Sequence, residues 1–440
     1  MRIAFINPIF TLVSNNDALK EFIKDSPFMY FYSQFWSGFS NGLLTLAALT
    51  PDDIESVYID ESHESIPFNE NFDIIAITAT TQQIMRAYAI AERFKNSPEP
   101  PCIVIGGSHA SFMSDEASRH VDVVFIGEAE NSWPQFLRDF RNGTWKKKYE
   151  AKDFPIVNMT EVPLPRYELL NPDHFNMIWI QSSRGCPINC EFCSATKFFG
   201  RKYRIKTEEQ VLREISEARK HMKMKQILFS DDNMFCNKDR NEALLGKLKE
   251  ADISFVAQAD ITIGENPDFL KVLKDSGCSI LFIGFESLDP RNLGLMNSTN
   301  WKQEKLSRYS EYIKNITEAG IGVYGAFIVG YDYDTNETFN DLANFVTDNY
   351  LSGAQITVLT PLPGTDLRER LRKSNRVLNT GWENYTFFDV NINHPILSRK
   401  EIEQGLLKTY KAIYNQEYLN RKNQYYHQVF LRNLEGAKNE

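Results

Sequence analysis

Three cysteines, Cys186, Cys190 and Cys193, are crowded into the stretch RGCPINCEFCSA at residues 184–195. Thiolates are soft ligands, and a group of them selects zinc, copper(I) or iron–sulfur. A structural zinc site needs a fourth ligand, but no cysteine or histidine follows at short spacing. An iron–sulfur cube held by three cysteines accounts for the missing ligand, because it leaves one iron open for a reaction.

Two other interpretations of the three cysteines stay open at this point. They could form a zinc site completed from a distant part of the chain, or they could be buried thiols that pack as small hydrophobic groups. The other cysteines are Cys102, Cys236 and Cys278, and their strand-like or loop contexts predict ordinary, at least partly buried thiols. Six cysteines in 440 residues do not form the dense disulfide framework of a small secreted protein.

Length and charge restrict the class of protein. A chain of 440 residues exceeds what one hydrophobic core usually spans, so two or three domains are expected. The net charge of −9 argues against a general nucleic-acid binder. The N-terminus MRIAFINPIF lacks the apolar segment of a signal peptide, and no run approaches the roughly 18 apolar residues of a membrane span. We therefore expect a cytoplasmic protein with no membrane span.

The first 141 residues alternate short Ile- and Val-rich runs with amphipathic stretches. Continuous apolar strands separated by helices indicate a parallel sheet covered on both faces, so we expect an α/β, doubly wound Rossmann-like domain. Its strands are predicted at 3–7, 56–60, 73–79, 102–107 and 122–128, and its helices at 42–49, 82–95 and 132–140.

A second alternation begins after a proline-rich stretch, 142–176, which we interpret as a linker. Six β/α units in series over 177–364 predict a partial (β/α)6 barrel, and the charged remainder, 365–440, is expected to be helical. The barrel strands are predicted at 177–185, 226–232, 253–260, 279–287, 322–330 and 353–364, and the helices at 208–221, 238–250, 267–275, 302–319 and 336–349.

The barrel places the three cysteines where chemistry is expected. They follow its first strand, and active sites of such barrels are built from the loops at the carboxyl ends of the strands. Gly185 and Pro187 are suited to shape the turn. Phe192 stands between the last two cysteines and is expected to pack against the metal site and keep water away from it.

The spacing C-x-x-x-C-x-x-C at this position resembles the signature of the radical S-adenosylmethionine (SAM) enzymes. In that family the cysteines hold a [4Fe-4S] cluster whose open iron binds the amino and carboxylate groups of SAM. One electron then cleaves SAM to methionine and a 5′-deoxyadenosyl radical. The resemblance therefore implies SAM as a cofactor and an external electron donor of the flavodoxin or ferredoxin type.

The resemblance extends along the barrel. FSDDNMF (229–235), FIGFESLD (282–289), GAFIVGYDYDT (325–335) and TPLPGTDL (360–367) resemble the family's segments after the second, fourth, fifth and sixth strands. It implies that the loop of Asp231 and Asp232 receives the methionyl amino group, and that Glu286 and Ser287 face the ribose or amino group. The complete set of SAM-binding residues implied in this way is Phe192, Asp231, Asp232, Gln258, Glu286, Ser287 and Gly330.

The first domain resembles that of the cobalamin-binding class of radical SAM enzymes, which includes the hopanoid methylases. The motifs are GGSHASF after the fourth strand and FIGEAENSWPQFL after the fifth. Small and hydroxyl residues at the strand ends would leave room for the nucleotide tail of cobalamin. The implied cobalamin-binding residues are Thr78, Thr80, Thr81, Gly106, Gly107, Ser108, His109, Gly127 and Glu128. A strand-to-helix turn is an alternative explanation for Gly106 and Gly107.

One motif departs from the general cobalamin pattern. The sequence D-x-H-x-x-G, whose histidine binds cobalt, is absent after the first strand, where the chain reads NPIFTLVSNND. His109 is the nearest histidine to the expected site. Members of this class often bind cobalamin without a histidine ligand, so the resemblance still implies the cofactor.

The resemblance implies a C-methyltransferase that acts on an unactivated carbon of a small-molecule or lipid-like substrate. An enzyme of the same architecture that catalyses a cyclisation, rearrangement or oxidation is the alternative. A zinc-stabilised scaffold and a simple electron carrier are the alternatives outside this chemistry. The aromatic stretch SPFMYFYSQFWSGF (26–39) is expected to pack against the barrel, or else to form an apolar wall for the substrate.

Overall fold

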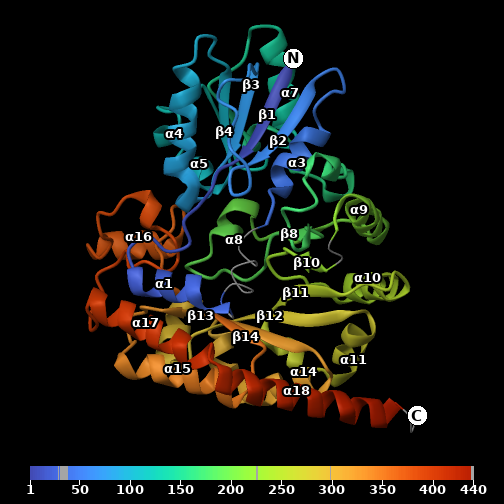
Figure 1. The fold of residues 1–440 in the computed structure, drawn as a ribbon, viewed down its shortest axis with the longest axis vertical. Helices are drawn as coiled ribbons and strands as arrows, with labels where there is room; N and C mark the ends of the chain where they lie inside the picture. Colours follow the sequence, from blue (N-terminus) through green and yellow to red (C-terminus); the bar gives the residue numbers. More distant parts are fainter. Residues whose placement is uncertain (28, 30–37, 224–225, 298, 438–440) are drawn as a thin grey trace.

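The computed structural model describes residues 1–27, 29, 38–223, 226–297 and 299–437. It contains two six-stranded parallel sheets, with the N-terminal sheet above the second one in Figure 1. Helix α8 (Ser194–Phe199) lies between them. This arrangement confirms the predicted fold class, an α/β Rossmann-like domain followed by a partial barrel and a helical C-terminal region.

The first sheet has the strand order β2-β1-β3-β4-β5-β6, with all neighbours parallel. Its strands are β1 (Arg2–Asn7), β2 (Glu55–Asp60), β3 (Ile74–Thr78), β4 (Cys102–Gly106), β5 (Val123–Ile126) and β6 (Lys148–Glu150). Alternate residues of β3 face different cores, because Ala76 belongs to one apolar cluster and Ile75 and Ile77 to the other. Both faces are thus buried, which explains why the strands read as continuous apolar runs.

Helices cover both faces of this sheet. They are α3 (Asn41–Ala48), α4 (Ile84–Lys95), α5 (Ser108–Phe112), α6 (Ser114–Ala117) and α7 (Ser132–Arg141). Helix α1 (Asp17–Asp25) instead packs against α17 (Arg399–Ile413) of the C-terminal region. The expected linker, 142–176, is a partial misreading, because its early residues form β6 at the edge of this sheet. A three-residue strand that pairs on one side only leaves too weak a periodic signal to be recognised in sequence.

The second sheet has the order β14-β13-β12-β11-β10-β7, again all parallel. Its strands are β7 (Ile178–Ile180), β10 (Ile227–Phe229), β11 (Phe255–Ala259), β12 (Cys278–Glu286), β13 (Gly322–Val329) and β14 (Gly353–Val358). The helices between them are α9 (Glu208–His221), α10 (Lys238–Glu250), α11 (Pro267–Asp275), α12 (Pro290–Met296), α13 (Trp301–Lys305), α14 (Tyr309–Glu318) and α15 (Asn336–Asp348).

Capping residues explain why several helix limits could be read from sequence. Thr207 and Gln210 form a capping box at the start of α9, which runs over the predicted 208–221. Such a box satisfies backbone donors that have no partner within the helix. The predicted helix 302–319 is instead divided into α13, a short 3₁₀ turn and α14.

The C-terminal helices α16 (Asp366–Lys373), α17 (Arg399–Ile413) and α18 (Gln416–Ala437) follow the last strand, and α17 covers the sheet edge at β14. The hydroxyl of Tyr410 pairs with the backbone N–H and carbonyl of Ile356 at 2.9 Å each. The hydroxyl of Tyr414 does the same at Ala354. The edge strand is therefore closed to further strand pairing. No helix in the described part of the chain is long and apolar enough to span a membrane.

Candidate active site at the junction of the two sheets

The cysteine loop begins at a short strand that the sequence did not separate from the first barrel strand, predicted at 177–185. A two-residue strand, β8 (Ser183–Arg184), pairs antiparallel with β9 (Arg204–Ile205), and the loop connects β8 to α8. Gly185 has a φ of +86°, and a Cβ there would lie 2.4 Å from the carbonyl oxygen of Lys202. Only glycine satisfies both conditions, so the residue before Cys186 is held close to the β9 hairpin.

The three thiols lie in a largely desolvated loop. Cys186 is buried, whereas Cys190 and Cys193 are partly exposed. Burial raises the pKa of the Cys190 thiol to about 12 and also raises that of Cys193. Cys193 precedes the first turn of α8, whose backbone N–H groups offset part of this effect. A bound cation would reverse this preference for the neutral thiol, since metal-bound cysteine is deprotonated.

The residues fit a cube better than a single ion. Among the residues with assigned positions, no three His, Cys, Asp or Glu side chains are grouped as ligands of one metal ion. A cube does not require such a group, because each cysteine binds a different iron. The donor set is thus three thiols on one loop that emerges from the carboxyl end of the first barrel strand.

Cys236 has a less ordinary place than expected. Its thiol interacts with that of Cys186, and this interaction lowers the pKa of Cys186 and raises that of Cys236. Its Sγ also lies 3.4 Å from the carbonyl oxygen of Asn233. Cys236 follows β10, so parallel pairing of β7 and β10 brings it to the cysteine loop. The spacing in sequence did not indicate this proximity.

The hydrogen-bonding capacity of the Asp231 carboxylate is used within the protein. Its side chain is fully buried and accepts hydrogen bonds from the Oγ atoms of Ser182 (3.0 Å) and Ser183 (2.5 Å) and from the Ser183 backbone. Arg240 contacts Ser182 from the other side. Asp231 therefore holds the end of β10 to the segment before β8, and we withdraw it as a SAM contact.

Asp232 remains a candidate for SAM binding. Its Oδ2 accepts a hydrogen bond from the Gly185 N–H at 3.1 Å, next to the first cysteine. Burial raises the pKa of this carboxyl to about 6. An acidic group beside the cysteine loop is suited to accept a hydrogen bond from an amino group of a ligand.

Glu286 lies at the end of β12 in a conformation unusual for a non-glycine residue, with a φ of +68°. Its Oε1 accepts a hydrogen bond from Lys302 Nζ at 2.8 Å, and the same Nζ donates to the carbonyl of Gly284 at 2.7 Å. A Cβ at Gly284 would lie 2.3 Å from Glu286 Oε1, so this glycine leaves room for the carboxylate.

Lys302 is a site residue that sequence reasoning missed. Its side chain is 10% exposed, and its positive charge acts on Cys190, as does the charge of Glu286. Asn297 Nδ2 lies 4.0 Å from Cys190 Sγ. Both groups come from the segment after β12, where the sequence predicts only a helix at 302–319, with Asn297 before its start. The sequence of a charged helix does not show that one of its lysines points into the protein.

The other expected SAM contacts divide into two groups. Gln258 is half-buried on β11, and Phe192 packs against the apolar cluster of Leu293, Met296 and Tyr331. The other two have roles in turns: Ser287 accepts a hydrogen bond from the Asp289 N–H, and the N–H of Gly330 donates to Asp334 Oδ2 at 2.7 Å. Gly330 has a φ of +99°, which explains the glycine.

A cavity of about 410 Å³ lies between the first sheet and the cysteine loop. One wall is made by strand ends, since alternate residues of neighbouring strands point into it: Ala76 and Thr78, and Val104 and Gly106. The opposite wall includes Ser194, Ala195, Phe198 and Phe199 of α8. Six of the nine expected cobalamin-binding residues line this cavity: Thr78, Gly106, Gly107, Ser108, Gly127 and Glu128.

Thr80, Thr81 and His109 lie elsewhere, and we withdraw them as cobalamin contacts. Thr80 Oγ1 donates to Gln83 at the start of the following helix. His109 is fully buried, with Nδ1 3.2 Å from Thr81 Oγ1, and burial lowers its pKa. Its ring packs against Trp382 of the C-terminal region at 4.9 Å. The first turn of α5 directs this side chain away from the cavity.

Gly107 is required by the turn itself. Its φ is +95°, and a Cβ there would lie 2.6 Å from the carbonyl oxygen of Ala79. The strand-to-helix turn is therefore a sufficient explanation of Gly107. Gly106 differs, because a Cβ would meet only Phe125 Cβ at 3.6 Å, an ordinary contact. The space beside Gly106 is thus open, and with the hydroxyls of Thr78 and Ser108 it suits a polar cofactor tail.

Arg184 connects the cysteine loop to the first domain. Its guanidinium pairs with Glu128 and Glu130 at 2.6 Å each, and Arg204 also pairs with Glu128 at 2.9 Å. All four side chains are about one-tenth exposed. Glu128 was expected to contact cobalamin, and the structure adds this ion pair to its place in the cavity wall.

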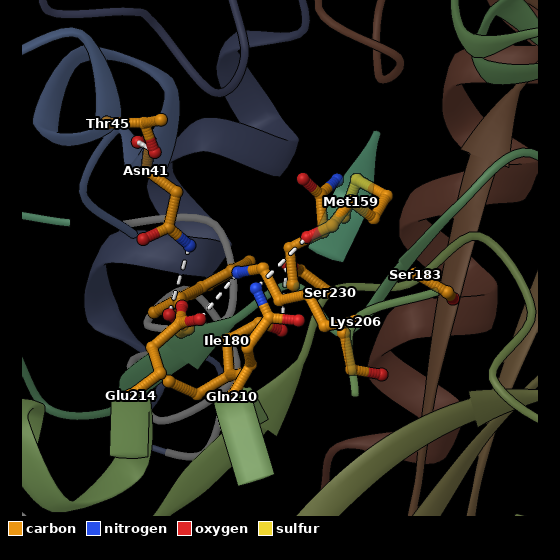
Figure 2. A network of polar contacts seen from close by, with 12 residues as sticks. Asn41, Thr45, Met159, Ile180, Ser183, Lys206, Gln210, Glu214 and Ser230 are labelled. Atoms are coloured by element: carbon orange, nitrogen blue, oxygen red, sulfur yellow. Dashed lines mark hydrogen bonds and ion pairs between the residues drawn. The ribbon is translucent and has the colours of Figure 1, made fainter. Parts of the chain in front are cut away.

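A second polar network joins the same two parts of the chain (Figure 2). Asn41 of α3 donates from Nδ2 to the carbonyl of Trp179 in β7 at 3.0 Å. Nearby, Lys206 and Glu214 form a buried ion pair, and Gln210 donates to the carbonyl of Met159. The Asn41 contact joins the first domain to the first strand of the barrel, whereas the other two hold α9 to the residue after β9 and to the segment before the barrel. Most of the aromatic stretch 26–39 lies outside the described residues, so its predicted role stays untested.

The chain matches two family models in sequence. The model of the radical SAM superfamily matches residues 180–346, and that of the B12 binding domain matches residues 42–137. Among known proteins, bacteriochlorophyllide d C-8(2)-methyltransferase from Chlorobaculum tepidum is 31% identical over 389 residues, 86% of this chain and 85% of that protein. Hopanoid C-2 methylase from Rhodopseudomonas palustris is 27% identical over 350 residues, 77% of this chain and 65% of that protein.

Solved structures show the same fold. The radical S-adenosylmethionine methyltransferase TsrM from Kitasatospora setae, with cobalamin and a [4Fe-4S] cluster bound, superposes with a TM-score of 0.67 at 14% identity. The match covers 93% of this chain and 90% of that one. The likeness therefore includes both sheets and the C-terminal helices.

Proposed function

Because this chain belongs to the radical SAM superfamily and carries a B12 binding domain, we propose that it is a cobalamin-dependent C-methyltransferase acting on an unactivated carbon. The observation that carries the proposal is the shared cavity. Its walls are the strand ends of the first sheet and the helix that begins after Cys193. A cofactor held by the first domain would thus adjoin the cysteine loop.

When bound, the three cofactors supply reductive cleavage of SAM, hydrogen removal by the resulting radical and methyl transfer from cobalt. The chain itself holds and orients these groups. Cys186, Cys190 and Cys193 are the proposed cluster ligands, and Gly185 fixes the start of their loop. The rings of Phe198 and Phe199 in the cavity wall exclude water from the space between the cofactors.

The SAM site is proposed at the carboxyl ends of β10, β11 and β12. Asp232 and Glu286 supply acceptors for the amino and hydroxyl groups of SAM, and Gln258 supplies a neutral contact. Lys302 keeps the Glu286 carboxylate in place through the 2.8 Å contact. Phe192, Ser287 and Gly330 shape the surrounding turns.

A small-molecule or lipid-like substrate is proposed from the relatives. The two relatives are named for methylation of a bacteriochlorophyllide and of a hopanoid. We also propose a reducing, cytoplasmic location, which the six free cysteines support.

The test is anaerobic reconstitution of the full chain with iron, sulfide and cobalamin, followed by incubation with SAM labelled in the methyl group and an extract of the source cells. We expect cobalt bound near one equivalent, 5′-deoxyadenosine, and label in an extractable product. Formation of 5′-deoxyadenosine without bound cobalt or labelled product would favour the non-methylating cyclisation, rearrangement or oxidation. Zinc in place of iron would refute both readings.

A further inference from the structure

We propose that the surface beside the cysteine loop, formed by Lys152, Pro155, Ile156, Arg201 and Lys202 around the exposed Pro187, docks a small acidic protein that carries one electron. We call these six residues the docking surface. The inference rests on the proposed function, because a radical SAM enzyme needs an external reductant. It adds where on this chain the reductant binds.

The docking surface begins one residue from a proposed cluster ligand. Pro187 follows Cys186 and is exposed. The guanidinium of Arg201 donates to the Pro187 carbonyl oxygen from Nε at 3.3 Å and from Nη2 at 3.0 Å. The backbone of Lys202 packs on Gly185, on the other side of Cys186. A protein seated here would thus contact the loop that holds the cluster.

Charge at this surface is opposite to that of the whole chain, which carries −9. Arg201 and Lys202 are both exposed, and neither has an ion-pair partner among the residues that the structure describes. The neighbouring Lys152 pairs with Glu150, whose side chain is 29% exposed, against 73% for the lysine. An acidic partner would therefore find its complement here, although the rest of the enzyme repels it.

The centre of the docking surface is apolar and hollow. A cavity of about 290 Å³ is lined by Phe154, Pro155, Ile156 and Phe199 together with the three basic residues. Ile156 is 71% exposed, the largest exposed fraction among the large hydrophobic residues described. An apolar centre within a charged rim is the usual anatomy of a protein interface.

Two residues lie between the docking surface and the cavity that separates the two sheets. Phe199 and Glu128 line both this cavity and the 410 Å³ cavity between the sheets. In the transfer itself, one electron leaves the reduced carrier and enters the cluster, so the carrier is oxidised and the cluster reduced by one electron. No bond or proton needs to move.

The experiment measures anaerobic reduction of the reconstituted cluster by stopped-flow absorbance, with reduced flavodoxin as the acidic carrier and dithionite as a small reductant. The test variant is Arg201→Glu with Lys202→Glu. The matched control is Lys247→Glu with Lys249→Glu on α10, which changes the net charge equally on exposed residues elsewhere. A second variant, Ile156→Asp, alters the apolar centre.

We expect reduction by flavodoxin at low salt to fall at least about tenfold in Arg201→Glu/Lys202→Glu and to lose most of its salt dependence. Reduction by dithionite, iron content and the α10 control should match the wild type. Ile156→Asp should also weaken flavodoxin binding. Equal flavodoxin rates in wild type and Arg201→Glu/Lys202→Glu would overturn the docking surface while leaving the proposed function intact. A wild-type protein that cleaves no SAM even with dithionite would refute the proposed function, and this proposal with it.

Discussion

At the scale of single residues, the site depends on groups whose roles differ despite similar chemistry. Asp231 and Asp232 are adjacent acids with different surroundings. Asp231 is fully buried and bonded to Ser183, whereas Asp232 accepts a hydrogen bond from Gly185 at the cysteine loop. Gly106 and Gly107 are adjacent glycines, yet only Gly107 is required by its backbone angle. Substitution can therefore separate structural from cofactor-binding roles at neighbouring positions.

The cysteines give the first prediction. Cys186→Ala, Cys190→Ala and Cys193→Ala should each abolish SAM cleavage and lose most of the iron, because a cube with two protein ligands is not retained. Cys278→Ala, a buried thiol on β12, is the control and should keep the cluster. Iron and sulfide content after reconstitution is the measurement.

Cys236 makes this prediction stricter, since its thiol contacts that of Cys186. Cys236→Ala should retain iron, because the ligand set is complete without it. Loss of the cluster as complete as in Cys193→Ala would show that four cysteines, not three, bind the metal.

Glu286 gives the second prediction. Glu286→Gln keeps the shape but removes the charge paired with Lys302, and losing a charge-assisted hydrogen bond costs about 1.5–3 kcal/mol. The affinity for SAM should fall roughly tenfold to a hundredfold with the cluster still assembled. Equilibrium dialysis with labelled SAM measures this. A dissociation constant equal to that of the wild type would remove Glu286 from the site.

At the scale of elements, the ends of the strands position the residues of the cavity and of the cysteine loop. Parallel pairing sets the ends of β3, β4 and β5 at one cavity, and the ends of β7, β10 and β12 around the cysteine loop. The turns after these strands carry buried polar groups that hold their shape. Asp334 does so after β13, where it accepts hydrogen bonds from the backbone of Gly330 and Tyr331 and from Asn292.

The strand end at Gly106 gives the third prediction. Gly106→Leu should fold, because a Cβ there has ordinary contacts, but its side chain would fill space beside Phe125 in the cavity. Cobalt bound after reconstitution should fall to background while iron stays, and methyl transfer should vanish while some SAM cleavage persists. Gly107→Leu is a poorer test, since a clash with Ala79 would strain the turn itself. Normal cobalt content in Gly106→Leu would contradict the assignment of the cavity to cobalamin.

Asp334 gives the fourth prediction, which concerns pH. Burial raises the pKa of this carboxyl to about 7, so the folded state favours the protonated form. Its contribution to stability is then fully present below about pH 4 and is lost as pH rises through 7. The stability of wild type relative to Asp334→Asn should fall across this range, by at most about 1.4 kcal/mol per pH unit. Urea unfolding at several pH values, with the exposed Asp348→Asn as control, measures it; a constant difference would contradict the shift.

At the scale of the whole molecule, the two sheets are coupled through the residue that precedes the cysteine turn. Arg184 pairs with Glu128 and Glu130 of the first domain, and Glu128 also lines the cavity. The hydrogen bond from Asn41 of α3 to Trp179 of β7 and the close approach of Gly38 to the Trp179 ring add to this connection. Buried charged groups thus help to set the position of the cysteine loop relative to the first domain.

The fifth prediction follows from this coupling. Glu128→Gln leaves Arg184 and Arg204 with one fewer carboxylate in a buried setting, and breaking a buried pair costs about 3–5 kcal/mol. Thermal unfolding should shift to a clearly lower temperature. Asp53→Asn, which breaks the exposed pair with Arg141, should change stability by no more than about 1 kcal/mol. Equal effects of the two substitutions would show that the Arg184 pair does not hold the domains together.

The sequence by itself determined the α/β alternation, most strand positions and the loop that carries the three cysteines, because apolar periodicity and short-range spacing are local properties. The direction of a side chain at a strand end is not local. It follows from register and from neighbours far along the chain, and for this reason Asp231, Thr81 and His109 form hydrogen bonds with protein groups that the sequence did not indicate. The same reason explains the residues that sequence reasoning missed. Arg184 pairs with Glu128, which lies 56 positions earlier in the chain. Lys302 and Cys236 come close to the cysteine loop only when the barrel strands pair.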